Sequence, residues 1–165
     1  MRARAQDDAI VLAPPSTLPS VTATDEIRNL LGTYCELMDQ GDFNALGALF
    51  TNGQLADEAG TAIAVGAAAV ADLYHVGTML YDGSPRTKHV VANTVIDWEE
   101  DASTAVARSS YVVFQQTEDL PLQAIISGRY HDTFEHHDGA WRFAERRFSI
   151  DLLGDLSHHL RYELS

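Results

Sequence analysis

The chain has 165 residues, with 24 acidic side chains against 11 lysines and arginines, a formal net charge of −13 and one cysteine, Cys35. That length is typical of a single domain and suffices to bury a core without a disulfide or metal staple. One cysteine excludes an internal disulfide and a cysteine-based zinc site, and it favours a cytoplasmic location. The acidic balance argues against nucleic acid or a membrane surface as a partner, because both select basic faces.

The first twenty residues are interpreted as a disordered leader, and residues 21–165 as the folded domain. The apolar run 9–13 stops at Pro14-Pro15 and is too short for a secretory signal. Nowhere do about 18 apolar residues run unbroken, so we expect no membrane span.

Three helices are expected in the first half of the chain. The first follows Thr24 as its N-cap and ends at Gly41, and a second, short helix starts at Asp42. A third is expected over residues 66–80. Their apolar faces, at helical spacing, are Ile27, Leu30, Leu31, Tyr34 and Met38; Phe43, Leu46, Leu49 and Phe50; and Val70, Leu73, Tyr74 and Gly77.

After Pro85 the sequence becomes rich in β-branched and aromatic residues. Long strands are predicted over residues 88–98, 104–117, 122–137 and 140–150, and Asp138-Gly139 is a hairpin signal. Because twist accumulates along long strands, they cannot stay flat. We therefore predict an α+β fold, a cone-shaped, mainly antiparallel sheet with about three N-terminal helices on its concave side and a pocket at its open end.

Two residues in separate elements are candidates for acid–base chemistry. Asp39 lies in the last turn of the first predicted helix, where its charge opposes the helix dipole, and His89 opens the first long strand. Each alone has an ordinary explanation, a solvated helix end for Asp39 and a structural histidine for His89. Together they could form a general base in which the carboxylate fixes the imidazole tautomer.

Four runs of sequence resemble one known family. Residues 34–50, Lys88–Asn93, Gly128–Asp132 and 138–146 together resemble the SnoaL-like domain of the nuclear transport factor 2-like superfamily, over roughly residues 24–160. The resemblance implies a curved mixed sheet, about three helices closing a deep apolar cavity, and a homodimer or higher homo-oligomer. The fold hosts many activities, so it does not define a function.

The resemblance also implies roles for particular residues. Asp39 and His89 match the positions of an Asp–His pair in scytalone dehydratase and the lindane dehydrochlorinases, in which the pair removes a proton and a leaving group departs. Tyr34 is similarly placed to the oxyanion-hole tyrosine of ketosteroid isomerase, and Asp57 to its general base.

Tyr34 and four further residues are candidates for the pocket. Tyr34 either packs or donates its phenol to a substrate oxygen, and Asp57 is either solvent-facing or a second pocket carboxylate. Tyr130 and Asp132 share strand parity, so one register turns both toward the same side, and Tyr111 narrows the space beside them. We take Asp57, Tyr111, Tyr130 and Asp132 as candidate substrate-binding residues.

The sequence favours neither a metal nor a redox cofactor. The pairs His136-His137 and His158-His159 have no ligand spacing, since adjacent strand side chains point to opposite faces. Neither a glycine-rich dinucleotide fingerprint nor a phosphate loop is found. The tail over residues 153–160 is expected to cover one end of the barrel or to form a subunit contact.

Two classes of function fit these residues. The first is a cofactor-independent lyase or isomerase on a small hydrophobic, carbonyl-bearing or polycyclic substrate, with His89 as base and acid, Asp39 orienting it, and Tyr34 with Tyr111 or Tyr130 polarising the substrate oxygen. The second is a non-catalytic binding or assembly module, similar to the small subunit of ring-hydroxylating dioxygenases. Epoxide opening would need an Asp-Arg-Asp arrangement that we cannot place here.

Overall fold

The computed structural model describes residues 22–99 and 102–162. The predicted leader, residues 1–20, lies outside these residues. Of the described helices, none is long and apolar enough to cross a membrane.

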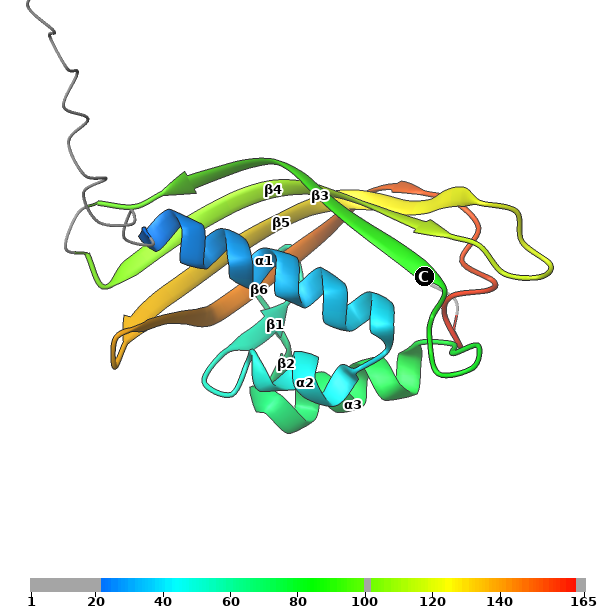
Figure 1. Ribbon diagram of the computed structural model, residues 1–165, viewed down its shortest axis with the longest axis horizontal. Coiled ribbons are helices and arrows are strands. Elements are labelled where there is room, and N and C mark those ends of the chain that lie inside the picture. The colour runs from blue at the N-terminus through cyan, green and yellow to red at the C-terminus, as the bar shows by residue number, and fades with distance from the viewer. Residues whose placement is uncertain (1–21, 100–101, 163–165) are drawn as a thin grey trace, which may run out of the picture.

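Six strands form one open, mixed sheet in the order β2-β1-β6-β5-β4-β3 (Figure 1). β1 and β6 are parallel, and every other neighbouring pair is antiparallel. The strands are β1 (Gln54–Ala56), β2 (Ala62–Val65), β3 (Thr87–Asp97), β4 (Thr104–Gln115), β5 (Gln123–His137) and β6 (Ala140–Leu153). This confirms the predicted α+β fold with its mainly antiparallel sheet.

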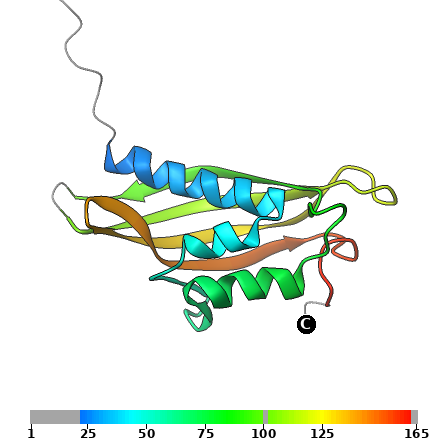
Figure 2. The ribbon, with the colours of Figure 1, turned by 60° about the horizontal axis from the view of Figure 1, so that its bottom comes forward.

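Three helices, α1 (Ala23–Gln40), α2 (Phe43–Ala48) and α3 (Gly66–Gly77), lie on the same face of the sheet (Figures 1 and 2). The tight corner between α1 and α2 follows from two local signals. Gly41 ends α1 in the left-handed conformation at φ 78°, and Asp42 caps α2 by accepting a hydrogen bond from the backbone N–H of Ala45. The corner brings the end of α1 over the sheet.

Helix α1 begins two residues earlier than expected. Its N-cap is Thr22, so the prediction of Thr24 is wrong. The physical reason is a capping box: the Thr22 hydroxyl accepts from the backbone N–H of Asp25, and the Asp25 carboxylate accepts from the backbone N–H of Thr22. These bonds satisfy donors at the helix start that Thr24 would leave unpaired.

The long strands curve over the helices rather than running flat (Figure 1). Register shifts interrupt the pairing between Ala92 and Val95 of β3, where Asn93 has φ 54°, and between Ser127 and Gly128 of β5. Such bulges bend a strand and increase its twist. The concave side that results faces the helices.

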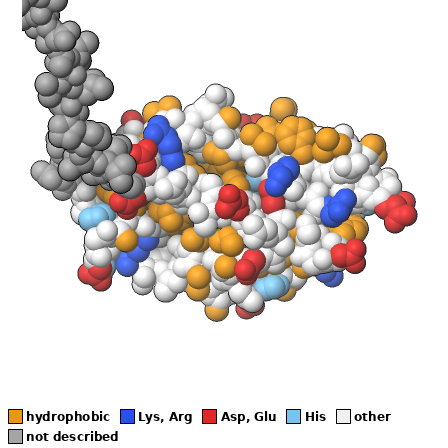
Figure 3. All heavy atoms as spheres, viewed as in Figure 1, with side chains coloured by type: hydrophobic (Ala, Val, Ile, Leu, Met, Phe, Trp, Pro, Cys, Tyr) orange, Lys and Arg blue, Asp and Glu red, His pale blue; other side chains and the backbone are white. Residues whose placement is uncertain are grey.

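The main core fills the space between the helices and this concave side. Nine of its residues are completely buried; Ile27, Phe43, Leu46, Phe50 and Val70 come from the helical part of the chain, and Leu55, Ala107, Phe134 and Phe143 from the sheet. Acidic and basic side chains are dispersed over the face shown in Figure 3. The charge surplus is consistent with a solvated shell around an apolar interior.

Gly128 allows two strands and a tyrosine to meet in the sheet. A Cβ atom at this position would lie 1.8 Å from the carbonyl oxygen of Ser149 and 2.8 Å from the hydroxyl of Tyr111. The Tyr111 hydroxyl donates a hydrogen bond to that same carbonyl, at 3.1 Å. The absence of a side chain at Gly128 therefore makes room for this bond.

Substitution of Gly128 is expected to disturb the sheet. Gly128→Ala should lower the free energy of unfolding by roughly 3 kcal/mol, because its methyl group would overlap a backbone oxygen that cannot easily move. Gly32→Ala is the matched control, since a Cβ there meets nothing within 4 Å and alanine in a helix interior should stabilise by about 0.5–1 kcal/mol. Urea denaturation measures both, and equal stabilities for Gly128→Ala and the parent would refute the close approach.

Candidate active site

Asp39 connects the end of α1 to the start of β3. Its Oδ1 accepts a hydrogen bond from the Thr87 hydroxyl at 2.8 Å and lies 2.7 Å from His89 Nδ1. The backbone N–H of His89 also reaches the carboxylate, 3.0 Å from Oδ2. Lys88 Nζ lies 3.7 Å from Oδ2 on a largely exposed side chain. A carboxylate in the last turn of a helix is thus held by donors from the neighbouring strand.

These contacts define the state of the dyad. Burial opposes ionisation of Asp39, but the hydrogen bonds from His89 and Thr87 outweigh it, so the pKa of Asp39 lies below its ordinary value. An ionised carboxylate can only accept, and His89 Nδ1 must therefore carry the proton in this hydrogen bond. His89 Nε2 is left as the nitrogen that can accept a proton.

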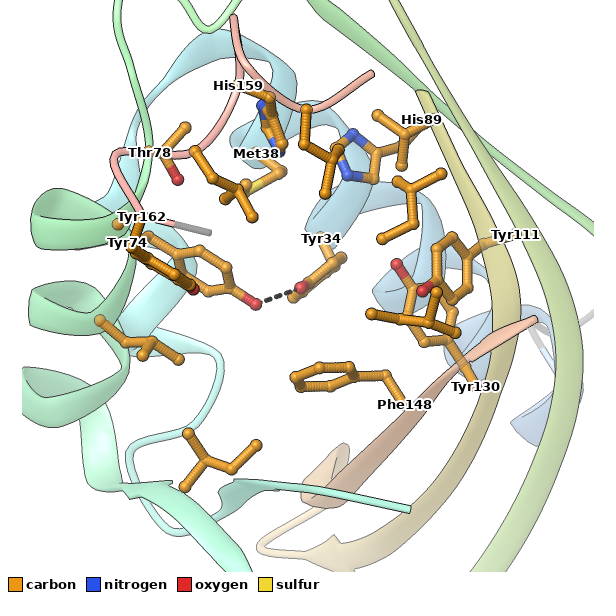
Figure 4. A pocket seen from close by; sticks show the side chains of 18 residues that line it. Tyr34, Met38, Tyr74, Thr78, His89, Tyr111, Tyr130, Phe148, His159 and Tyr162 are labelled. Atoms are coloured by element: carbon orange, nitrogen blue, oxygen red, sulfur yellow. Dashed lines mark hydrogen bonds between the residues drawn. The ribbon is translucent and has the colours of Figure 1, made fainter. Parts of the chain in front are cut away.

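His89 forms part of the wall of a pocket of about 300 Å³ between α1, α3, the sheet and the C-terminal segment (Figure 4). The imidazole is nearly buried, with 6% of its side-chain surface exposed. Most of the wall is apolar; it includes Met38, Leu73, Val113, Ile126, Phe148 and Leu156. Ile63, Ile150 and Tyr162 line the pocket and also reach the molecular surface, so they form its rim.

Besides Tyr162 at the rim, four tyrosines line the pocket with His89 (Figure 4). The hydroxyls of Tyr34 and Tyr74 are 2.5 Å apart, and because one donates to the other, one O–H of the pair stays available. Tyr130 stacks on Tyr111, with ring centroids 4.3 Å apart. Burial raises the pKa of Tyr111 to about 12 and that of Tyr34 above its ordinary value. At neutral pH these phenols are therefore protonated and can donate hydrogen bonds.

A buried ion pair lies behind the tyrosines. Arg146 and Asp132 are completely inaccessible and form two parallel hydrogen bonds of 2.8 Å. The guanidinium lies 4.1 Å from the ring centre of Tyr34 and 3.9 Å from that of Tyr130. A cation over an aromatic face is attractive, most strongly where water is excluded. Arg146 therefore fixes the positions of two tyrosine rings without lining the pocket itself.

The structure brings together some of the residues predicted from sequence and separates others. His89, Tyr34, Tyr111 and Tyr130 line the pocket, and Asp39 supports His89 from behind. Asp132 does not reach this pocket, because it pairs with Arg146. The carboxylate of Asp57 accepts a hydrogen bond from the backbone N–H of Thr61 in the turn between β1 and β2, away from the pocket.

Sequence reasoning does not identify Tyr74 and His159, two of the polar residues that line the pocket. Tyr74 was assigned to the buried face of its helix, and its hydroxyl in fact reaches Tyr34. His159 comes from the C-terminal segment and is 7% exposed. The signal for His159 is its spacing from Leu156 and Leu160, since a helical turn places all three on one side; the backbone N–H groups of His159 and Leu160 both bond to the carbonyl of Leu156.

Between residues 22–99 and 102–162, no group of three or more histidine, cysteine or carboxylate side chains could hold a metal ion. The polar side chains that line the pocket are the imidazoles of His89 and His159, the tyrosine phenols and the hydroxyl of Thr78.

The family profile of the SnoaL-like domain matches residues 19–147, and the chain belongs to this family. This confirms the resemblance to the nuclear transport factor 2-like superfamily. None of the curated proteins matches this sequence significantly.

Solved structures share the fold. A nuclear transport factor 2-like protein with a cystatin-like fold from Novosphingobium aromaticivorans is 27% identical, with 77% of this chain and 80% of that chain covered and a TM-score of 0.63. Two others come from the same organism. A candidate scytalone dehydratase is 21% identical over 86% of this chain and 89% of that one, with a TM-score of 0.64. The beta subunit of a candidate aromatic-ring-hydroxylating dioxygenase is 22% identical over 79% and 90%, with a TM-score of 0.62.

The stability of the protein should depend on His159 at mildly acidic pH. Burial, with a further contribution from His89 nearby, lowers the pKa of His159 from 6.5 to about 4. The unfolded chain then binds this proton more readily than the folded one, so stability is complete above pH 6.5 and falls as the pH drops toward 4. The loss should reach about 3 kcal/mol.

Denaturation at several pH values measures this effect. His159→Gln should flatten the fall between pH 6.5 and 4, whereas the control His75→Gln, at an exposed imidazole outside the pocket, should leave it unchanged. A variant with the same pH dependence as the parent would contradict the burial of a neutral His159.

Proposed function

We propose that this protein is a lyase or isomerase that removes a proton from a small hydrophobic, carbonyl-bearing or polycyclic substrate without a cofactor. The observation that carries the proposal is the position of His89: its Nδ1 is tied to the buried carboxylate of Asp39, and its ring lines an apolar pocket. A base that is held in one orientation, is nearly buried from solvent and lines a pocket large enough for a small ligand is suited to proton transfer.

The proposed reaction starts with proton abstraction. His89 Nε2 takes a proton from the carbon next to the substrate carbonyl, and the electrons of that C–H bond move to the carbonyl oxygen as an enolate. Asp39 stabilises the imidazolium that results, as the carboxylate of a catalytic triad does. In a lyase, the enolate then re-forms the carbonyl and expels hydroxide or halide from the neighbouring carbon; the imidazolium gives its proton to the hydroxide, which leaves as water, or to solvent when halide leaves. In an isomerase, the imidazolium returns the proton to a different carbon.

The tyrosines would stabilise the negative charge that develops on the substrate oxygen. Tyr34 and Tyr74 retain one free O–H between them, and among the described residues no side chain or backbone group hydrogen-bonds to the Tyr130 hydroxyl. Tyr111 is less suited to this role, because its hydroxyl already donates to the Ser149 carbonyl. We therefore assign the oxyanion contacts to Tyr34 and Tyr130. Preorganised donors of this kind typically supply a large part of the rate enhancement.

We also propose that the chain forms a cytoplasmic homodimer. Val90, Val95 and Val106 are each more than 40% exposed, and Val90 follows His89 on the opposite face of β3. An apolar outer face on a sheet favours self-association. A mass of one chain in sedimentation equilibrium would refute the dimer.

The cytoplasmic location is supported by the single cysteine of the chain. Cys35 is free and buried, which suits a reducing compartment.

The competing function is a non-catalytic binding or assembly module. One observation favours it: Asp39 also binds Thr87 and the backbone of His89, so the dyad could serve only to fasten α1 to β3. The fold shared with a dioxygenase beta subunit is compatible with this role. The open pocket argues against a purely structural role, because a structural cone would be filled by its own side chains. Co-purification with a larger iron-containing chain would favour the module.

The enzyme proposal predicts that activity depends on both members of the dyad. On a panel of bicyclic hydroxy-ketones and haloalkanes, His89→Gln should lower kcat/KM by roughly 10²–10⁴-fold, because glutamine cannot act as the base. Asp39→Asn should lower kcat and also move the acidic limb of the pH–rate profile to lower pH, since an amide stabilises the imidazolium less than a carboxylate does.

His75→Gln is the matched control, because this histidine lies on α3 outside the pocket. It should turn over substrate as the parent does. Circular dichroism would establish that the variants fold. A folded His89→Gln protein with the parent's rate on a substrate of the panel would remove the dyad from the mechanism.

A further inference from the structure

The C-terminal segment places a second imidazole at the His89 end of the pocket. Figure 4 shows His159 and His89 at the top of the view, with the rings of Tyr34, Tyr74, Tyr111 and Tyr130 below them. The two residues come from unrelated parts of the chain, β3 and the segment after β6. Both line the same pocket, so a ligand that contacts His89 also lies within reach of His159.

Backbone hydrogen bonds hold this segment in place. The carbonyl of His159 accepts from the N–H of Met79 at 2.8 Å. The carbonyl of His158 accepts from the Tyr81 hydroxyl and from Gln115 Nε2, each at 2.8 Å. The N–H of Arg161 donates to the carbonyl of Gly77 at 2.9 Å. His159 is therefore fixed from both sides and is not a loose end of the chain.

The imidazole of His159 is buried without a protein partner. Within the described part of the chain, its Nδ1 is closed off from solvent and makes no hydrogen bond. An unpaired N–H in such a place costs more than an unpaired acceptor nitrogen. The favoured tautomer of the neutral ring therefore carries its proton on Nε2, which is then a donor.

We propose that His159 forms a second polar subsite of the pocket, in which Nε2–H donates a hydrogen bond to a neutral oxygen of the ligand. This oxygen is distinct from the carbonyl oxygen that the tyrosines contact. The ligand class is accordingly a compact, apolar ring system with two oxygens, a carbonyl and a hydroxyl or second carbonyl. The inference rests on the proposed function, because it places the ligand carbonyl at the tyrosines.

The electrostatics of the pocket give the two histidines different tasks. Burial and the nearby His89 hold the pKa of His159 at about 4, so the ring is neutral at physiological pH. A proton taken up by His89 would disfavour a second positive charge on His159 even more. Asp39 contacts His89, and among the described residues no carboxylate bonds to the His159 ring. His89 is thus suited to take up a proton, and His159 to donate a hydrogen bond.

Equilibrium binding of two matched ketones tests the subsite. The probes are 1-tetralone, with one oxygen, and 4-hydroxy-1-tetralone, which adds a hydroxyl; dissociation constants are measured by calorimetry. The parent should prefer the hydroxylated ketone by roughly 2–10-fold, the range of one neutral hydrogen bond. His159→Phe should remove this preference, and His159→Gln, whose side-chain amide still donates, should keep most of it.

The variants separate this role from a structural one. A merely structural histidine would change both affinities together, whereas a subsite changes their ratio. The proposal is overturned if the parent protein binds the two ketones with equal affinity or binds neither of them. It is also overturned if His159→Phe still prefers the hydroxylated ketone. If His159→Phe does not fold, the ratio measured for the parent and for His159→Gln decides. Binding is measured without turnover. If the protein prefers the hydroxylated ketone but shows no activity, the proposed enzymatic function is refuted and the proposed His159 subsite still stands.

Discussion

The carboxylate of Asp39 is the contact on which both the fold and the proposed chemistry depend. It lies in the last turn of α1, where its charge opposes the helix dipole, and the donors that hold it come from the first residues of β3. The same bonds join the helical layer to the sheet and orient His89 toward the pocket. A residue that is unfavourable in its own helix is thus stabilised by tertiary structure, which is common at functional sites.

A second constraint is the complete burial of the charged side chain of Arg146. Its partner Asp132 satisfies two of its donors, while Nη1 has no partner among the described residues. Burying such a pair is costly compared with an apolar core. Here the guanidinium lies against the rings of Tyr34 and Tyr130, which form one wall of the pocket. We interpret the ion pair as a support that keeps these phenols in position.

Much of this architecture could be predicted from the sequence, because it depends on patterns that are local. The helix corner at Gly41 and the four long strands follow from periodicity and turn residues, and the Asp39–His89 contact follows from their positions in the recognised family. The short strands β1 and β2 are too brief for a periodic signal; β1 forms by pairing with β6, and β2 by pairing with β1. The spacing of His159 from Leu156 and Leu160 indicates that the three share one side of a turn, but only the folded backbone brings that side into the pocket beside His89. The pairing of Asp132 with Arg146 likewise depends on the register of two strands.

The central claim, that His89 is a base directed at a carbon next to a carbonyl, can be tested without knowing the natural substrate. Incubation of the protein with 2-tetralone in D₂O, followed by NMR, reports the exchange of the protons beside the carbonyl. The account predicts exchange well above the buffer rate with the parent protein and exchange at the buffer rate with His89→Gln. Equal exchange rates for the two proteins would contradict it.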